Sequence, residues 1–166
     1  MILGVISDTH GNRMLMHQVA TRLVREHGAE QILHLGDDYE DAEELAATCY
    51  DVCAVPGLWC EAYHNPRVPK TRVERFAGVD VALAHADKDL GRKERAADIV
   101  LTGHTHRAAI EEKNGAIYVC PGHLRRAVDR GERASYAVLH LDAEAVRVVI
   151  HEAGGVREEH RCTLTR

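Results

Sequence analysis

The sequence predicts an α/β fold in which two sheets face each other and helices cover the outside. Strand-like and helix-like segments alternate in the first third of the 166 residues, which favours a parallel sheet with right-handed crossovers. The last third holds successive strand-like segments, which favours a meander. An apolar content of 45% and a charged content of 28% are ordinary for a globular protein. The length suits one domain over residues 1–166.

Short apolar segments in the first third predict strands. Each is long enough for a buried strand and too short for a helix: Ile2–Ser7, Ile32–Leu35 and Val52–Val55. A helix is expected over Arg13–His27, because apolar side chains recur every four residues on one of its faces. The Ala, Glu and Leu content of Asp41–Thr48 predicts a second, shorter helix. The first third is therefore strand, helix, strand, helix, strand.

The middle of the chain is less regular. Leu58–Pro69 contains two prolines and is expected to form a loop over the site, with Trp59 either as a lid or as a packing residue. Thr71–Phe76 and Val79–Ala84 flank a glycine turn and predict an antiparallel hairpin. The charged segment Asp87–Ala97 is expected to hold a short helix.

Further strands are expected in the rest of the chain. The segments are Asp98–Thr102, Ala109–Glu112, Ala116–Cys120, Ser135–Leu141 and Ala145–His151. Asn114-Gly115 is a typical two-residue hairpin turn, and Asp142-Ala143-Glu144 is expected to link the last two strands.

Composition limits the classes of partner and compartment. A net charge of −5 disfavours nucleic-acid binding, which depends on basic surface. No apolar run approaches the roughly 18 to 20 residues of a membrane span. The first strand begins directly after Met1, and the five cysteines form no CxxC pair, so we expect a cytoplasmic protein with reduced thiols.

Side chains suited to metal chemistry follow the ends of the predicted strands. In parallel sheets, ligands bind beyond the carboxyl ends of the strands, so these side chains are expected to lie close together. They are two carboxylates and four imidazoles: Asp8, His10, Asp37, His85, His104 and His106. Mixed oxygen and nitrogen ligation suits Mn, Fe, Zn, Ni or Co better than calcium.

The number of these side chains points to more than one metal ion. Six ligands are too many for one tetrahedral site, whereas they suit two ions that share a carboxylate. Two ions roughly 3.5–4 Å apart form a clamp for in-line displacement at phosphorus. A water between them becomes hydroxide near neutral pH and serves as the nucleophile. The pattern therefore predicts a metal-dependent phosphoesterase.

The order of the motifs resembles that of the calcineurin-like metallophosphoesterases, and especially their small YfcE-like phosphodiesterases. The motifs are Asp8-Thr9-His10-Gly11-Asn12, Gly36-Asp37, His85 and Gly103-His104-Thr105-His106. The resemblance covers Met1 to about Leu141. It implies a four-layer α/β/β/α sandwich of two facing mixed sheets and activity on a small phosphoester, first of all a phosphodiester.

The resemblance also implies roles for individual residues. One divalent metal, manganese before the others, would be held by Asp8, His10, Asp37 and His106. A second would be held by Asp37, His85 and His104, with Asp37 as the bridge. Asp37, His104 and His106 would be catalytic, whereas Asn12 and His123 would contact the substrate.

The chain departs from the family pattern in three places. Leu58 stands after Pro56-Gly57, where the family has an asparagine that ligates the second metal, and Cys60 or Glu61 is the substitute ligand to consider. Ala86 replaces the usual glycine after His85, which is a mild change. Cys120-Pro121-Gly122-His123 replaces Asn-Pro-Gly-Ser, so His123 points to the substrate or metal, or else lies on the surface.

These departures leave a second function open, a non-catalytic or weakly active scaffold on the same fold. Relatives with eroded ligand sets act as protein-interaction subunits, as in the retromer coat. In that case His85 and His104 would be structural histidines. Asn12 is equally suited to cap the first helix, and an exposed edge or Trp59 would support a homodimer. Other polar residues are expected to be structural: His17, His27, His34, His140, His151, Asp38 and Asp41.

Overall fold

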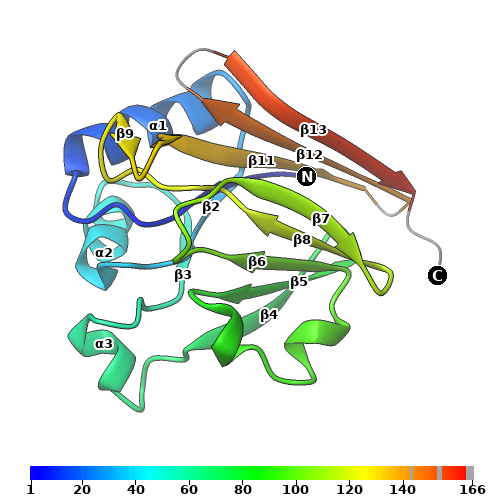
Figure 1. Cartoon of the computed structure of the whole chain (residues 1–166), viewed down its shortest axis with the longest axis horizontal. Coiled ribbons are helices and arrows are strands. Elements are labelled where there is room, and N and C mark those ends of the chain that lie inside the picture. The colour runs from blue at the N-terminus through cyan, green and yellow to red at the C-terminus, as the bar shows by residue number, and fades with distance from the viewer. Residues whose placement is uncertain (143, 153–154, 164–166) are drawn as a thin grey trace.

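Two sheets face each other in the computed structural model, which describes residues 1–142, 144–152 and 155–163 (Figure 1). The larger sheet has six strands. Their spatial order is β13 (Gly155–Thr163), β12 (Ala145–Glu152), β11 (Ser135–Leu141), β1 (Ile2–Ile6), β2 (Gln31–His34) and β3 (Val52–Ala54). As predicted, β1, β2 and β3 are parallel, and β11 and β12 are antiparallel. Strand β13 extends this antiparallel part of the sheet.

The smaller sheet has five strands and is also mixed. Their spatial order is β4 (Thr71–Phe76), β5 (Val79–Ala84), β6 (Ile99–Thr102), β8 (Ala116–Cys120) and β7 (Ala109–Lys113). The predicted hairpin of β4 and β5 is confirmed, and so is the Asn114-Gly115 turn, whose φ angles are 54° and 80°. Because β5, β6 and β8 are parallel, their carboxyl ends lie at one edge of the sheet.

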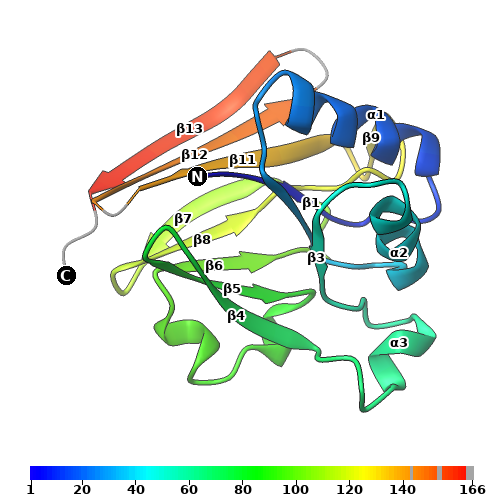
Figure 2. The same cartoon turned by 180° about the vertical axis from the view of Figure 1, so that it is seen from behind.

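Buried side chains of the described residues form three clusters, one between the two sheets and one on the outer face of each sheet. Valine, leucine and isoleucine from both sheets fill the space between them, with Leu3, Leu33, Leu83 and Leu101 fully buried. A second cluster joins the larger sheet to α1 (Arg13–Arg25) and α2 (Tyr39–Ala47). On the outer face of the smaller sheet, Leu90 and Ala97 pack against side chains of β5 and β6. Figure 2 shows the green turns between β5 and β6 that carry this segment. The predicted α/β/β/α sandwich is confirmed.

Several local predictions differ from the structure. The segment Asp87–Ala97 contains two short 3₁₀ turns, η1 (Asp87–Asp89) and η2 (Glu94–Ala96), in place of a helix. The predicted loop over 58–69 contains one helical turn, α3 (Glu61–His64). Ala143, in the predicted link between the last two strands, lies outside the described residues.

Two strand pairs were not expected from the sequence. The edge strand β13 pairs, among the described strands, with β12 alone, and a small hairpin is formed by β9 (Val128–Asp129) and β10 (Glu132–Arg133). The hairpin lies between β8 and β11 along the chain, and it matters for the site because Asp129 on β9 contacts His106. No helix within the described residues is both long and apolar enough to cross a lipid bilayer.

Candidate metal centre

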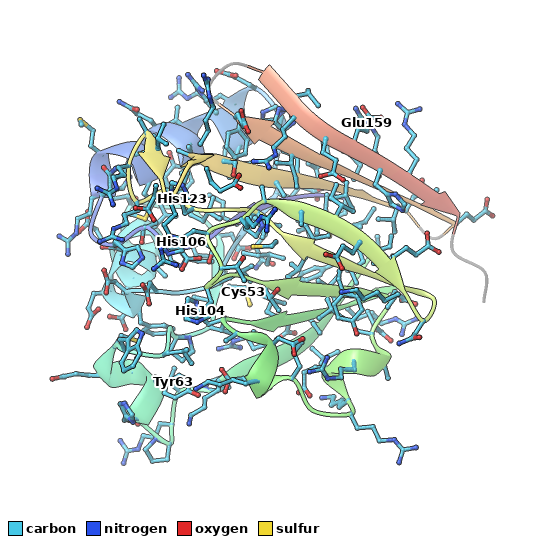
Figure 3. All side chains as sticks on the ribbon, in the orientation of Figure 1. Cys53, Tyr63, His104, His106, His123 and Glu159 are labelled. Atoms are coloured by element: carbon cyan, nitrogen blue, oxygen red, sulfur yellow. The ribbon has the colours of Figure 1, made fainter. Side chains whose placement is uncertain are left out.

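The six predicted ligands lie just beyond the strand ends of both sheets. Asp8 and His10 follow β1, Asp37 follows β2, His85 follows β5, and His104 and His106 follow β6. A hydrogen bond from the Asp8 amide to the Gly36 carbonyl, 2.7 Å long, ties the first two strand ends together. Figure 3 places His104 and His106 at one end of the sandwich, with His123 beside His106.

Asp8, His10 and His106 form the tightest group of candidate ligands. Their ligand atoms all lie within 4.8 Å of one another, which among the described residues is true of this histidine and carboxylate group alone. The Nε2 atoms of His10 and His106 are 3.1 Å apart, and Asp8 Oδ1 lies 3.3 Å from His106 Nε2. Three nitrogen and oxygen donors therefore face one point.

Asp37 links this group to His85. Its Oδ2 atom lies 3.0 Å from His10 Nε2, and its Oδ1 atom lies 3.7 Å from His85 Nε2. The two carboxylate oxygens thus face the two predicted halves of the site. His104 stands beside His85, with ring centroids 5.2 Å apart, and its backbone amide donates a 2.9 Å hydrogen bond to Asp8 Oδ2.

Hydrogen bonds at Nδ1 orient two of the histidine rings and direct their Nε2 atoms toward the site. His106 Nδ1 lies 2.7 Å from Asp129 Oδ2, and His85 Nδ1 lies 2.7 Å from the Leu35 carbonyl. Because both oxygens accept hydrogen bonds, each Nδ1 carries a proton, and in the neutral form of each ring Nε2 then offers a lone pair. In that neutral form the two lone pairs face carboxylate oxygens of Asp8 and Asp37, so an acceptor faces an acceptor at both places.

This opposition of acceptors tests whether the residues fit metal ions. His85 Nε2 is buried and has no hydrogen-bond partner among the described residues. A buried lone pair that faces a carboxylate costs free energy unless a cation lies between them. Mixed imidazole and carboxylate donors are also the ligand types that first-row divalent metals prefer. The residues therefore fit bound divalent metal ions.

Asp129 is a site residue that the sequence analysis missed. It is buried on β9 and accepts the hydrogen bond from His106 Nδ1, so it orients the imidazole from behind. Hydrogen bonds from Arg126 and then from His106 hold the pKa of Asp129 well below its usual range. Carboxylate partners of this kind fix the tautomer and orientation of ligating histidines. The sequence offered one signal, an acidic residue amid arginines.

Asp41 and Ser7 were also missed as supports of the site. Asp41 was expected at a helix start, yet its buried Oδ2 accepts hydrogen bonds from Thr9 Oγ1 at 2.6 Å and from the Gly11 amide at 3.0 Å. It therefore fixes the loop that carries Asp8 and His10. Ser7 Oγ donates a 2.6 Å hydrogen bond to Asp8 Oδ2, which leaves Oδ1 to face the site.

The backbone at the site adopts conformations that most residues avoid. Asp8, His10, His104 and His106 have φ angles of 53°, 47°, 67° and 62°. Left-handed conformations of non-glycine residues cost of order 1–3 kcal/mol each, and they cluster at functional sites. Gly103, which precedes His104, is required because of space and not because of its φ angle: a Cβ atom there would overlap Ser7 Oγ.

Electrostatics at the site follows from burial and from the close charges. Burial raises the pKa of Asp8, but His106, His85 and Ser7 outweigh it and the net pKa is lowered. The hydrogen bond with His10 lowers the pKa of Asp37. The contact with Asp8 raises the pKa of His106, whereas burial lowers the pKa of His104. Both aspartates are therefore anionic near neutral pH.

The two predicted substrate contacts occupy different positions. Asn12 Oδ1 accepts a 3.3 Å hydrogen bond from the Leu15 amide, which confirms the predicted cap, and Asn12 Nδ2 donates to the Arg125 carbonyl at 3.0 Å. His123 is fully buried, so a surface position is wrong. Its Nε2 lies 3.2 Å from the Glu132 carbonyl, and its ring centroid is 5.3 Å from that of His106.

The turn after β3 holds the residues that depart from the family pattern. The Gly57 amide donates a 3.1 Å hydrogen bond to the Asp37 carbonyl, so this turn abuts the candidate bridging residue. Leu58 is half-buried next to it. The Cys60 thiol is buried and donates to the Gly57 carbonyl at 3.2 Å. Trp59 is 85% exposed, so the alternative of a packing residue is wrong.

The same family emerges from comparison with known proteins. Residues 1–144 match the model of the calcineurin-like phosphoesterase superfamily domain. The chain is 28% identical over 165 residues to a protein of Methanothermobacter thermautotrophicus named "Probable metallophosphoesterase", with 93% of this chain and 94% of that protein covered.

Solved structures agree with the fold. YfcE, a phosphoesterase of E. coli, superposes with a TM-score of 0.76 at 20% identity, over 99% of this chain and all of YfcE. Vps29 of Entamoeba histolytica, in a structure with Zn²⁺, has a TM-score of 0.69 at 20% identity over 99% and 100% of the two chains.

The fold, the converging histidines and carboxylates, and the matched length place the protein in a family of metal-dependent phosphoesterases. The chain belongs to the calcineurin-like phosphoesterase superfamily. The resemblance inferred from the motifs is thereby confirmed.

Proposed function

We propose that the protein hydrolyses a small phosphoester, preferably a phosphodiester, at a dinuclear metal centre. The proposal rests on a series of close contacts between nitrogen and oxygen ligand atoms. The series leads from Asp8 through His106, His10 and Asp37 to His85. Asp8, His10, Asp37 and His106 would hold one divalent ion, and Asp37, His85 and His104 the other. Two such ions lower the pKa of water and offset the charge of the phosphoryl oxygens.

The chain's own residues prepare this centre before substrate arrives. Ser7 and the His104 amide bind Asp8 Oδ2, so Asp8 Oδ1 remains for the site. Asp129 keeps the proton on His106 Nδ1, so His106 Nε2 remains a ligand. Asn12 extends from the same loop as His10 and is held at the Arg125 carbonyl, where its amide would help to orient the phosphoester. Manganese is the metal we expect first.

Turnover of a generic aryl phosphodiester tests this function. Purified protein should release 4-nitrophenol from bis(4-nitrophenyl) phosphate after addition of Mn²⁺, and a chelator should abolish the release. Metal analysis of the same sample should give up to two ions per chain. The proposal is wrong if Mn²⁺, Ni²⁺, Co²⁺, Fe²⁺ and Mg²⁺ all fail to support turnover.

A scaffold role is the second candidate, because Leu58 stands where the family carries a metal-ligating asparagine. A leucine side chain offers no donor, so the second ion would be bound more weakly. The structural likeness to Vps29 is compatible with this candidate but shows the fold alone. A protein that purifies without metal and turns over no phosphodiester would favour the scaffold.

Leu58→Asn is expected to strengthen the second metal site. The new amide oxygen would lie on the turn that abuts Asp37, so the second ion should bind about tenfold more tightly, which corresponds to about 1.4 kcal/mol. Phosphodiesterase activity should rise as well. Calorimetric Mn²⁺ titration and rates on the aryl diester measure both effects, with Leu58→Ala as the control that removes leucine without adding a donor. Unchanged metal content and rate would mean that Leu58 is not at the ligand position.

A further inference from the structure

A basic segment lies beside the metal centre in this acidic protein. Residues 125–133 contain four arginines against two carboxylates, whereas the whole chain has a net charge of −5. The arginines are Arg125, Arg126, Arg130 and Arg133, and the carboxylates are Asp129 and Glu132. The local charge is therefore opposite in sign to that of the protein.

This basic segment is held in place against the centre. The β9–β10 hairpin closes through Arg130 and Gly131, whose φ angles of 51° and 85° are those of a tight hairpin turn. Asp129 binds His106 at 2.7 Å, and Asn12 binds the Arg125 carbonyl at 3.0 Å. The arginines are thus carried on a scaffold that is bonded to a candidate ligand and to the loop after His10.

The three arginines around Asp129 are engaged to different degrees. Arg126 donates to Asp129 Oδ1 from Nε at 2.8 Å and from a second nitrogen that lies closer still. Arg125 and Arg130 approach Asp129 only at 3.6 Å and 3.8 Å, and their side chains are 40% and 67% exposed. Within the described residues, neither of these two guanidinium groups donates a hydrogen bond. Arg126 holds Asp129 by hydrogen bonds, whereas the N–H groups of Arg125 and Arg130 remain available to a ligand.

We propose that Arg125 and Arg130 bind a second phosphate group of the substrate, beside the phosphoester that is hydrolysed. Guanidinium groups pair with phosphate in a bidentate manner, and two of them flank one carboxylate here. Glu132 does not cancel this charge, because Arg157 binds it at 2.8 Å and Arg107 lies 3.6 Å away. The preferred substrate is therefore a phosphoester that carries a further phosphate. This inference rests on the proposed function for its reaction, but not for the binding.

Binding to the metal-free protein tests the phosphate site without catalysis. Calorimetric titration with inorganic pyrophosphate in the presence of a chelator should show binding to the wild-type protein. The double variant Arg125→Gln, Arg130→Gln should weaken it at least tenfold, since each substitution removes a charge-assisted pairing with phosphate. Arg25→Gln is the matched control, because the length of α1 places it about 20 Å from Asn12. Absence of binding, or equal binding by the double variant, would overturn the proposal.

A pair of substrates then tests specificity. One is 4-nitrophenyl phenyl phosphate. The other is the same compound with a phosphonomethyl group on its phenyl ring, which is attached through carbon and is therefore not hydrolysed. The wild-type protein should favour the phosphonate compound through a lower KM, and the double variant should reduce this preference about tenfold, unlike Arg25→Gln. A preference that survives in the double variant contradicts the inference. Failure to hydrolyse either compound contradicts the proposed function instead, and pyrophosphate binding then decides the inference alone.

Discussion

The Asp8→Asn variant should lose at least about 100-fold of its phosphoesterase kcat/KM. Mutation of a residue that hydrogen-bonds to a metal ligand already lowers metal affinity or activity about 10–100-fold. Loss of a ligand itself should therefore lower activity by at least about 100-fold. The amide oxygen would take the hydrogen bonds from Ser7 and the His104 amide. The amide nitrogen would then face His106 Nε2 and donate to it, at the place where Asp8 Oδ1 now lies 3.3 Å away. The lone pair needed for the metal would be occupied.

The same substitution separates metal binding from folding. The metal-free variant should unfold at a temperature close to that of the metal-free wild-type protein, because it replaces a buried anion by an amide of equal size. Its melting temperature should no longer rise with Mn²⁺. Asp80→Asn is a suitable control, since Asp80 lies on β5 at the end opposite His85. A variant that keeps a tenth of the wild-type kcat/KM would contradict the role of Asp8.

The Asp129→Asn variant should lose about 10–100-fold in metal affinity and in kcat/KM, as is typical for the carboxylate partner of a ligating histidine. Arg126 binds Asp129 Oδ1 and would attract the amide oxygen. The amide NH₂ would then face His106 Nδ1 and favour the tautomer that carries its proton on Nε2. The imidazole would remain in place but offer the wrong nitrogen to the metal.

The tautomer itself is the decisive readout for Asp129. Nitrogen chemical shifts of the His106 ring in the metal-free protein should show the proton on Nδ1 in the wild-type protein and on Nε2 in the variant. Asp129→Glu should restore the wild-type tautomer and part of the activity, because it restores an acceptor. A variant with reduced activity but an unchanged tautomer would make Asp129 a purely structural residue.

The fold and the candidate ligands follow from features that are local in sequence. Short apolar segments give β1 and β2, and the parallel arrangement explains why Asp8 and Asp37 lie at one edge. Strand β13 escaped prediction because its charged residues, such as Arg157 and Glu159, lack the apolar alternation of a half-buried strand. The helical turn α3 and the two 3₁₀ turns are too short for a periodic pattern to appear.

Residues that act through the ligands depend on contacts that are distant in sequence. Asp129 lies 23 positions after His106, and Asp41 lies 32 positions after Thr9, with which it pairs. No periodicity relates these positions, since the pairs form only when the hairpin and the loop fold onto the strand ends. The left-handed φ angles at Asp8 and His10 were equally hidden, because both residue types usually adopt other conformations.

The candidate ligands are divided between the two sheets. Asp8, His10 and Asp37 come from the larger sheet, whereas His85, His104 and His106 come from the smaller one. The distance between the two sheets, which the interior side chains determine, therefore determines the distance between the two groups of candidate ligands. Selection for catalysis should thus reach interior positions such as Leu33 and Leu83, where even a conservative change of volume would retune a reaction that those side chains never touch.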